Sequence, residues 1–451
     1  MKPNTYSRKK PVFLFGITLM LCVSFSAYAE SNTRFIHVEA ANKAQRSAIA
    51  NHGMSIESVR SDSVWGFATL DEIANLQADG FKVLGSFDPS VARGGHESGF
   101  GFPPEDSRFH TYQENFDALK ELQGKNPDIS AIQSIGKSLE NRDLWAIHFN
   151  TSAEALKSGV SNKPGIIFMG NHHAREHLSL EVPLMLAQYL MEHRKEANIA
   201  KLLETRDIWI IPMVNPDGAE FDTSNGHYAM WRKNRRHNQD GSLGVDLNRN
   251  YSYKWGTGGS SSSGSSDVFM GPKPFSEPET TAIKDFVDSH LNTKILLTFH
   301  TFSELILYPW GHSNDKISNS ADLAAFENMA KTMAAWNHYT PEQASDLYIA
   351  SGDTTDWAYG VHGIFAFTFE LSPSSMWEGG FYPGAGVIDR VFNDNLQPCL
   401  YLLDLADNPH RAAASTRPSD LMESYVQPQG PNDIFLSNPT LENFGASTDP
   451  R

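Results

Sequence analysis

Four short segments of the chain are almost wholly apolar, with little alternation between hydrophobic and polar positions. They are residues 164–170, 208–214, 294–300 and 364–370. Strands of this kind are buried on both faces, as in a sheet that helices cover on both sides. Helical stretches lie between them, and residues 276–279 have the pattern of a capping box that opens a helix to His290. We therefore predict an α/β domain over residues 108–410, with a mixed, largely parallel central sheet.

A smaller unit precedes this domain, over residues 30–90. Its segments alternate in the order strand, helix, strand, strand, helix, strand, which is a split βαβ pattern and predicts a small α+β domain. Residues 91–107 are rich in Gly and Pro and predict a linker that proteases can reach. The polar residues 411–451 lack periodicity, which predicts a disordered tail.

Residues 1–29 have the pattern of a signal peptide. Residues 8–10 are basic, residues 12–25 form an apolar run, and residues 27–29 read Ala-Tyr-Ala, a small-x-small cleavage site. The apolar run is short for a membrane anchor, and Leu21 is a poor residue to precede a lipidated Cys22. We therefore expect export to the periplasm or out of the cell, with no membrane attachment after cleavage.

The net charge argues against a nucleic-acid partner, and the cysteine content excludes an intramolecular disulfide and a thiolate metal site. The net charge is −16, and an acidic surface repels the phosphate backbone, so we expect no nucleic-acid partner. Of the two cysteines, Cys22 and Cys399, only Cys399 would remain after signal cleavage. An intramolecular disulfide is then excluded, and any bound metal must be held by His and carboxylate side chains rather than by thiolates.

Ionisable residues follow three of the four apolar segments. The first segment leads into residues 171–176, the third ends in His300 and the fourth ends in Glu370. Because ligands of open α/β sheets bind at the carboxyl ends of the strands, we expect these side chains to lie close together. His173 and Glu176 are three residues apart, which places them on one face of a turn entering a helix.

An imidazole and a carboxylate are a common pair of zinc ligands, and His300 is a candidate for the third. Three protein ligands with one open position make a catalytic zinc site. Residues 173–177 also spell H-x-x-E-H, the inverted zinc-protease pattern, in which His173 and His177 bind the metal and Glu176 is the base. That motif belongs inside a helix, whereas here it follows a strand and a polar turn, so we retain it as the minor alternative.

Seven segments, in the same order along the chain, resemble zinc metallocarboxypeptidases of the A/B type, and the pattern is nearest to the bacterial carboxypeptidase T branch. They cover most of the predicted α/β domain. These segments are 171–176 (NHHARE), 214–218 (VNPDG), 231–235 (WRKNR), 244–250 (GVDLNRN), 299–301 (FHT), 348–357 (YIASGDTTDW) and 367–371 (FTFEL).

The resemblance implies one zinc ion and a role for each matched residue. His173, Glu176 and His300 match the zinc ligands of the family. Glu370 matches its general base, and Arg232 matches the cation that stabilises the oxyanion. These roles agree with the chemistry of the side chains, since a carboxylate can take a proton from water and a guanidinium can stabilise developing negative charge.

The resemblance also implies how substrate is held. Asn248, Arg249 and Tyr348 match the residues that bind the terminal carboxylate of the substrate, and a guanidinium suits a carboxylate through two parallel hydrogen bonds. Arg175 matches a residue that contacts the substrate further upstream. This set distinguishes an enzyme that removes C-terminal residues from one that cleaves within a chain.

Specificity follows from two positions near the expected side-chain pocket. Thr355 matches the floor of that pocket and is neither a large apolar residue nor an acid. Asp353, two residues earlier, could approach a basic side chain. We therefore expect mixed specificity for apolar and basic terminal residues. The resemblance implies that the walls are formed by Ala350, Thr298, Gly311 and Thr368.

The expected protein is a secreted, monomeric zinc carboxypeptidase that acts on the C-termini of peptides and proteins. Residues 30–90 occupy the place of the family's pro-segment, which covers the active site until it is cleaved. The resemblance also implies a cis peptide at Ser372-Pro373. Two alternatives stay open: a murein-peptide peptidase of the same fold, which need not keep the full carboxylate-binding set, and a non-catalytic zinc-fold binding module, which would normally lose Glu370.

Overall fold

The computed structural model describes residues 32–88 and 101–414. The predicted signal peptide, most of the predicted linker and most of the predicted tail therefore lie outside the described residues. Within the two described ranges, no helix combines the length and the apolar character that are needed to span a membrane.

The first described range, 32–88, forms a small α+β unit. Its elements are β1 (Thr33–Glu39), α1 (Lys43–Asn51), β2 (Ser55–Val59), β3 (Ser63–Thr69), α2 (Leu70–Ala78) and β4 (Val83–Phe87). They form an antiparallel sheet of order β2-β3-β1-β4 with its own apolar core, which includes Ile36, Val38 and Leu76. A capping box between Thr69 and Glu72 begins α2. The order of elements is the predicted split βαβ order.

The large unit is built on an eight-stranded mixed sheet of order β11-β10-β12-β9-β7-β8-β6-β5. The four central strands, β12, β9, β7 and β8, run parallel, as the sequence predicts. The strands are β5 (Ser130–Lys137), β6 (Asp143–Phe149), β7 (Gly165–Gly170), β8 (Asp207–Ile211), β9 (Thr293–Thr301), β10 (Leu305–Tyr308), β11 (Thr340–Gln343) and β12 (Phe365–Leu371).

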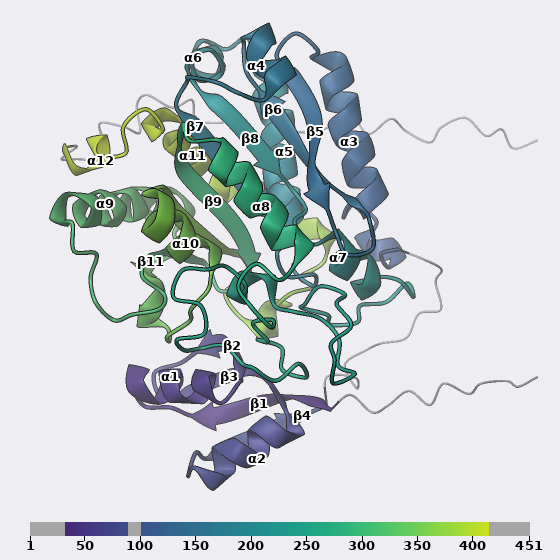
Figure 1. Cartoon of the computed structure of the whole chain (residues 1–451), viewed down its shortest axis with the longest axis vertical. Helices are drawn as coiled ribbons and strands as arrows, with labels where there is room; N and C mark the ends of the chain where they lie inside the picture. The colour runs from purple at the N-terminus through teal and green to yellow at the C-terminus, as the bar shows by residue number, and fades with distance from the viewer. Residues whose placement is uncertain (1–31, 89–100, 415–451) are drawn as a thin grey trace, which may run out of the picture.

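Helices cover both faces of this sheet (Figure 1). One face packs against α3, α5, α9 and α11, and the other packs against α8 and α10. Successive residues of β7 point alternately to the two faces of the sheet, and each face has its own apolar core. Ile166 and Phe168 lie in one core, and Ile167 and Met169 lie in the other, which explains why polar residues do not alternate along this strand. The helices are α3 (Tyr112–Lys125), α4 (Ala153–Ser158), α5 (Leu178–Glu192), α6 (Ala197–Thr205), α7 (Pro216–Asp222), α8 (Pro278–Ser289), α9 (Ser320–Asn337), α10 (Thr354–His362), α11 (Ile388–Leu405) and α12 (Arg411–Ala414).

Two local predictions are wrong. Strand β8 ends at Ile211 rather than at Val214, because Pro212 has no N–H group to continue the ladder. The expected capping box at 276–279 is absent, because the N-cap residue is Glu277 rather than Ser276; the Ser276 hydroxyl donates instead to the Glu277 carboxylate at 2.6 Å. Helix α8 begins instead with Pro278 in its first turn, where a missing N–H costs nothing. The Ser372-Pro373 bond is cis, as expected.

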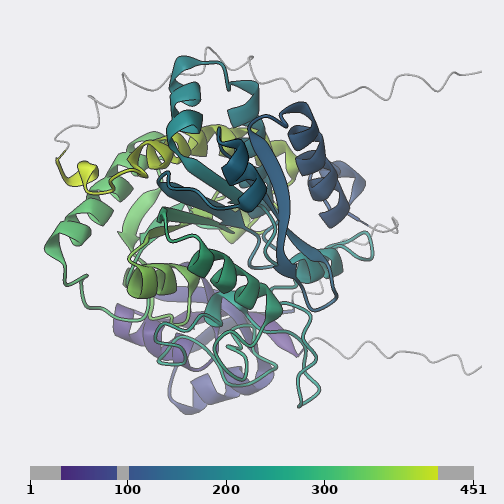
Figure 2. The same ribbon diagram turned by 45° about the horizontal axis from the view of Figure 1, so that its top comes forward.

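The small unit lies against the loops at the carboxyl ends of the central strands of the large one (Figures 1 and 2). Lys43 of α1 forms an ion pair of 2.9 Å with Asp346. The Arg46 guanidinium donates to the backbone carbonyl of Leu347 at 2.7 Å, and the Gly259 amide donates to the Asn51 side chain at 2.7 Å. Charged and polar contacts therefore hold the two units together around the strand ends, along with an apolar cluster in which Phe67 of the small unit packs with Phe302 and Phe381 of the large one.

Candidate active site

A cavity of about 480 Å³ opens where β7, β9 and β12 end. Most of its lining comes from the large unit, including His173, Glu176 and Glu370. The small unit contributes Arg46 and residues 56–60. The carboxyl ends of the parallel strands and the small unit thus enclose one space, and the predicted site residues can be placed relative to it.

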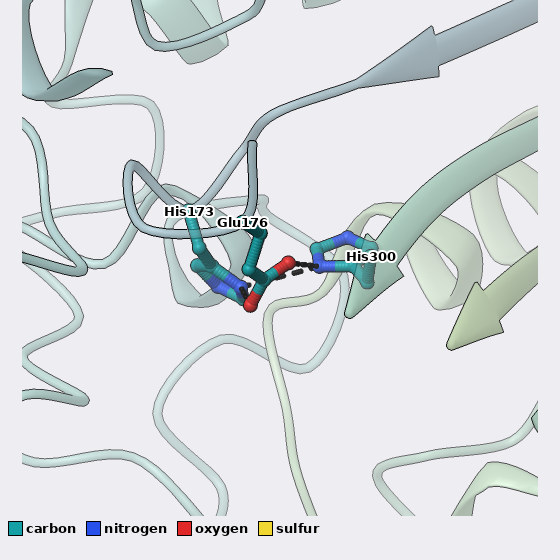
Figure 3. A group of neighbouring side chains, drawn as sticks. All are labelled: His173, Glu176 and His300. Carbon is teal, nitrogen blue, oxygen red and sulfur yellow. Dashed lines mark hydrogen bonds and ion pairs between the residues drawn. The ribbon is translucent and has the colours of Figure 1, made fainter. Parts of the chain in front are cut away.

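Three of the predicted residues form a compact group (Figure 3). His173 and Glu176 lie in the turn between β7 and α5, and His300 lies near the end of β9. His173 Nδ1 is 2.7 Å from Glu176 Oε1, and His300 Nδ1 is 3.0 Å from Glu176 Oε2. The two Nδ1 atoms are 3.2 Å apart. The chain enters this turn through Asn171, with a positive φ of 55° that asparagine tolerates better than most residues.

This donor set fits zinc. Zinc takes imidazole nitrogen and carboxylate oxygen at about 2.1 Å, so tetrahedral donors lie about 3.4 Å apart, only slightly further than the spacing here. His173, Glu176 and His300 are the group of metal-binding type found in the described part of the chain. The remaining ring nitrogen of His173, Nε2, lies 3.1 Å from Asp246 Oδ1, a carboxylate–histidine contact that orients metal-binding imidazoles.

The protonation states also suit a metal. Burial opposes ionisation of Glu176, but the imidazoles of His173 and His300 outweigh it and hold the pKa of this carboxyl below its usual value. Burial lowers the pKa of His300 despite the nearby Glu176 carboxylate. The group therefore offers an ionised carboxylate and an uncharged imidazole, the forms in which these side chains bind metal.

Glu370 lies beside this group on the neighbouring strand. It pairs in register with His300 across β12 and β9, and its side chain lines the cavity. Loss of solvent raises the pKa of Glu370 well above its usual value, and the carboxylates of Glu176 and Glu57 add to the effect. A carboxyl group that sits in a cavity beside a metal-binding group, with a raised pKa, is suited to proton transfer.

Asp246 connects several of these side chains. Its Oδ2 accepts hydrogen bonds from Arg232 Nε and Nη2 at 3.1 and 3.0 Å. Its Oδ1 faces His173 and accepts a hydrogen bond from the backbone N–H of Asn248 at 2.9 Å. Arg232 and His173 lower the pKa of Asp246 well below its usual value against the effect of burial. Asp246 was not among the predicted site residues, although its place in a matched motif, two residues before Asn248, was a usable signal.

The three residues expected to hold a carboxylate also line the cavity. Asn248 and Arg249 belong to a single 3₁₀ turn, Leu247–Arg249. Arg249 is held in place by its Nε, which donates to the carbonyl of Gly259 at 3.0 Å. The Tyr348 hydroxyl donates to the carbonyl of Ile56 in the small unit at 3.2 Å. All three side chains therefore face the same space as Glu370.

Arg175 is placed differently from the other predicted residues. Its side chain is fully buried between the rings of Phe67 and Phe381, with ring centroids at 4.6 and 4.2 Å from the guanidinium carbon. It forms ion pairs with Glu57 at 2.7 Å and with Asp267 at 3.3 Å. Two of these four partners, Phe67 and Glu57, belong to the small unit and lie over a hundred positions from Arg175, so no local sequence pattern indicates them.

Asp353 and Thr355 lie at the start of α10 and line the cavity. Asp353 Oδ1 accepts from the Asp356 amide at 2.8 Å and from the Thr355 hydroxyl at 2.7 Å, which caps the helix. The other oxygen, Oδ2, is buried and makes no hydrogen bond within the described ranges. Burial and the neighbouring Asp356 raise the pKa of Asp353 to about 7.

The inverted motif receives no support from the geometry. His177 Nε2 pairs with Asp222 Oδ2 at 2.8 Å, and the metal-binding group contains His300 in its place. Helix α5 begins at Leu178, after the motif rather than around it. His177 therefore acts in packing and in holding Asp222.

Comparisons with known proteins agree with this geometry. A family model described as zinc carboxypeptidase matches residues 116–398. A zinc carboxypeptidase of Saccharothrix mutabilis subsp. capreolus is 35% identical over 369 residues, which cover 78% of this chain and 84% of that protein. Carboxypeptidase A2 of Rattus norvegicus is 32% identical over 297 residues, with coverage of 64% and 67%. The crystal structure of carboxypeptidase A from Helicoverpa armigera superposes with a TM-score of 0.69 at 24% identity, covers 86% of this chain and 99% of that one, and shows the same fold.

Proposed function

The chain belongs to the zinc carboxypeptidase family and is a zinc metallocarboxypeptidase that acts on peptides, and from that premise we propose how its own residues remove a C-terminal residue. One observation carries the proposal. One ligand atom from each of His173, Glu176 and His300 lies within 4.8 Å of the other two, and Glu370 lies on the adjacent strand in register with His300.

His173, Glu176 and His300 hold the zinc ion in this proposal. Zinc, when bound, polarises the scissile carbonyl and lowers the pKa of a water molecule. Glu370 takes the proton of the attacking water and passes it to the leaving amine, which is the role of a general base and then a general acid. Arg232, oriented by two hydrogen bonds to Asp246, stabilises the oxyanion.

Asn248, Arg249 and Tyr348 bind the terminal carboxylate of the substrate. Their grouping at one cavity supports an exopeptidase of ordinary peptides over a murein-peptide peptidase, because the carboxylate-binding set is complete. The buried Arg175, freed from Glu57, contacts the substrate further upstream. Asp353 and Thr355 line the pocket for the terminal side chain and give mixed specificity for apolar and basic residues.

Residues 30–90 act as a pro-segment in this proposal. Glu57 supports it, since its carboxylate lies 2.7 Å from Arg175 and 3.9 Å from Arg232, inside the cavity that Glu370 lines. Cleavage in the linker would release both cations for substrate. The signal-peptide pattern of residues 1–29 supports export of the protein to the periplasm or out of the cell.

The variant Glu370→Gln tests the proposal. Gln cannot accept and transfer the proton, so we expect kcat to fall by about 10³-fold or more while the bound zinc stays stoichiometric. The wild-type protein, after limited proteolysis, should release single residues from free C-termini. Glu121→Gln, on the exposed face of α3, is the matched control and should behave as wild type. Full activity in Glu370→Gln, or cleavage within the peptide by the wild type, would contradict the proposal.

A further inference from the structure

Buried polar side chains lie directly behind the carboxylate-binding group, which we define as Asn248, Arg249 and Tyr348. His172 and Thr354 are both completely buried, and the mechanism above gives them no role. His172 stands next to a proposed metal ligand, and Thr354 stands next to the proposed pocket residue Thr355. Buried polar groups are costly unless they are hydrogen-bonded, so the partners of these two side chains indicate what they do.

The side-chain amide of Asn248 is held by its oxygen. Asn248 Oδ1 accepts from the Thr354 backbone N–H and from the Thr354 hydroxyl, both at 2.9 Å. A backbone N–H can only donate, so the atom that faces Thr354 must be the carbonyl oxygen and not the amide nitrogen. The Nδ2 group of Asn248, with its two hydrogens, is consequently available to donate to a ligand in the cavity that Asn248 lines. This orientation suits a carboxylate, which only accepts.

The same reasoning sets the direction of the Thr354 hydroxyl. Its single proton points to Asn248 Oδ1, because that oxygen carries no hydrogen of its own. Thr354 Oγ1 can then only accept from its other neighbour, His172 Nε2, at 3.3 Å. Tyr251 also lies near His172 Nε2, at 2.9 Å from its hydroxyl oxygen.

His172 completes the chain of hydrogen bonds. With the proton on Nε2, its Nδ1 is an acceptor, and the Thr298 hydroxyl lies 3.2 Å away as the donor. We assign this tautomer, and in it the direction is continuous: Thr298 donates to His172, His172 to Thr354, and Thr354 to Asn248. The Tyr251 hydroxyl oxygen is then a second acceptor for the His172 Nε2–H group. Every member of this chain is buried except Asn248, where it ends at the cavity.

We propose that Thr354 is a positioning residue that holds Asn248 with its amide N–H groups towards the terminal carboxylate of the substrate, and that His172 orients the Thr354 hydroxyl for this purpose. The inference rests on the proposed function, since it needs a carboxylate as the ligand of Asn248. Thr354 and His172 act on substrate binding only through the Asn248 side chain, and neither contacts the substrate.

The test compares Thr354→Val with Thr354→Ser. Valine keeps the shape and the backbone N–H but removes the hydroxyl, whereas serine keeps the hydroxyl. Thr354→Ala is a second variant without the hydroxyl, in case valine disturbs folding. Thr332→Val, at a buried threonine of α9, controls for the general cost of replacing a buried hydroxyl. Each protein is studied as the full chain and after limited proteolysis, with its zinc content measured.

Two ligands separate positioning from a general structural effect. Inhibition by free leucine depends on the carboxylate, and inhibition by leucine amide does not. For Thr354→Val and Thr354→Ala we expect KM for a peptide substrate and KI for leucine to rise about tenfold, with kcat within about threefold of wild type. KI for leucine amide and the zinc content should not change. Thr354→Ser should recover the wild-type values.

Other outcomes would overturn the inference in distinguishable ways. If the wild type binds leucine and its amide equally, the proposed carboxylate-binding function fails, and the positioning role fails with it. If the wild type prefers leucine and Thr354→Val keeps that preference, only the positioning role fails. An equal loss in Thr354→Ser or in Thr332→Val would likewise show that the hydroxyl of Thr354 has no specific part in binding.

Discussion

Replacing Asp353 by Asn should remove the preference for basic C-terminal residues and leave that for apolar ones. Asn is as good an N-cap as Asp, so the contacts of the first oxygen with Thr355 and the Asp356 amide can be kept. The second oxygen, Oδ2, faces Gly311, where a Cβ would lie only 3.3 Å away, so glycine keeps the approach to this oxygen open. Only the charge at the end of the pocket changes.

The expected loss of kcat/KM for substrates with a terminal Arg follows from Asp353 Oδ2, which has no hydrogen-bond partner within the described ranges. A hydrogen bond from a substrate guanidinium to a buried carboxylate contributes about 1.5–3 kcal/mol, or about 10- to 100-fold in kcat/KM. The pKa of Asp353, raised to about 7, makes this contribution depend on pH. The carboxyl is mainly neutral below pH 7 and mainly charged above it. The ratio of kcat/KM for Arg to that for Leu should therefore rise about tenfold from pH 6 to pH 8.

The assay measures kcat/KM for peptides that differ only in a terminal Arg, citrulline or Leu, between pH 5.5 and 8.5, after limited proteolysis. Citrulline has the shape of arginine without its charge. In Asp353→Asn the ratio of Arg to citrulline should fall to near one and lose its pH dependence. Asp285→Asn, at an exposed position of α8, is the charge control. A ratio that stays pH-dependent in Asp353→Asn, or wild-type rates for Arg and Leu that differ by several orders of magnitude, would refute the assignment.

Two further variants test the pro-segment and the core. Glu57→Gln removes the charge that pairs with buried Arg175. The ratio of the activity of the full chain to the activity after limited proteolysis should therefore rise about tenfold or more. An unchanged ratio would show that Glu57 does not contribute to inhibition by the pro-segment. Burial raises the pKa of Glu279 to about 7, so its contribution to stability is present below pH 4.5 and is lost as the pH rises through 7. Relative to Glu279→Gln, the wild type should lose ~3 kcal/mol of unfolding free energy in urea between pH 4 and pH 8, and parallel pH profiles would contradict this.

The parts of the fold that follow from the sequence are those with a local or periodic signal. Strand β7 is apolar throughout because its residues enter two cores, so its burial was visible in its composition. The meeting of His173, Glu176 and His300 followed from the rule that parallel strands end at one edge. The α/β class, the family and the zinc-binding donor set could therefore be predicted.

The parts that escaped prediction depend on partners far away in the sequence. Glu57 lies 118 positions from Arg175, in a separate unit, and no local pattern distinguishes it from other strand residues. Helix α8 has Glu277 rather than Ser276 as its N-cap residue, and the side chain of Asn250, 26 positions from Ser276, bonds to the Ser276 hydroxyl and to the Glu277 backbone N–H. Thr354 and His172 belong to two of the matched motifs, but their contacts with each other and with Asn248 depend on the placement of three segments that are far apart in the sequence.

The single carboxylate of Asp246 has a consequence for how such an enzyme can change over generations. One of its oxygens meets a metal ligand and the backbone of Asn248, and the other meets Arg232. In the proposed mechanism, affinity for the ion, stabilisation of the oxyanion and binding of the substrate carboxylate therefore all depend on this one side chain. A substitution at position 246 would therefore disturb all three properties together, so we expect variation in specificity at cavity residues that make no contact with Asp246, such as Asp353.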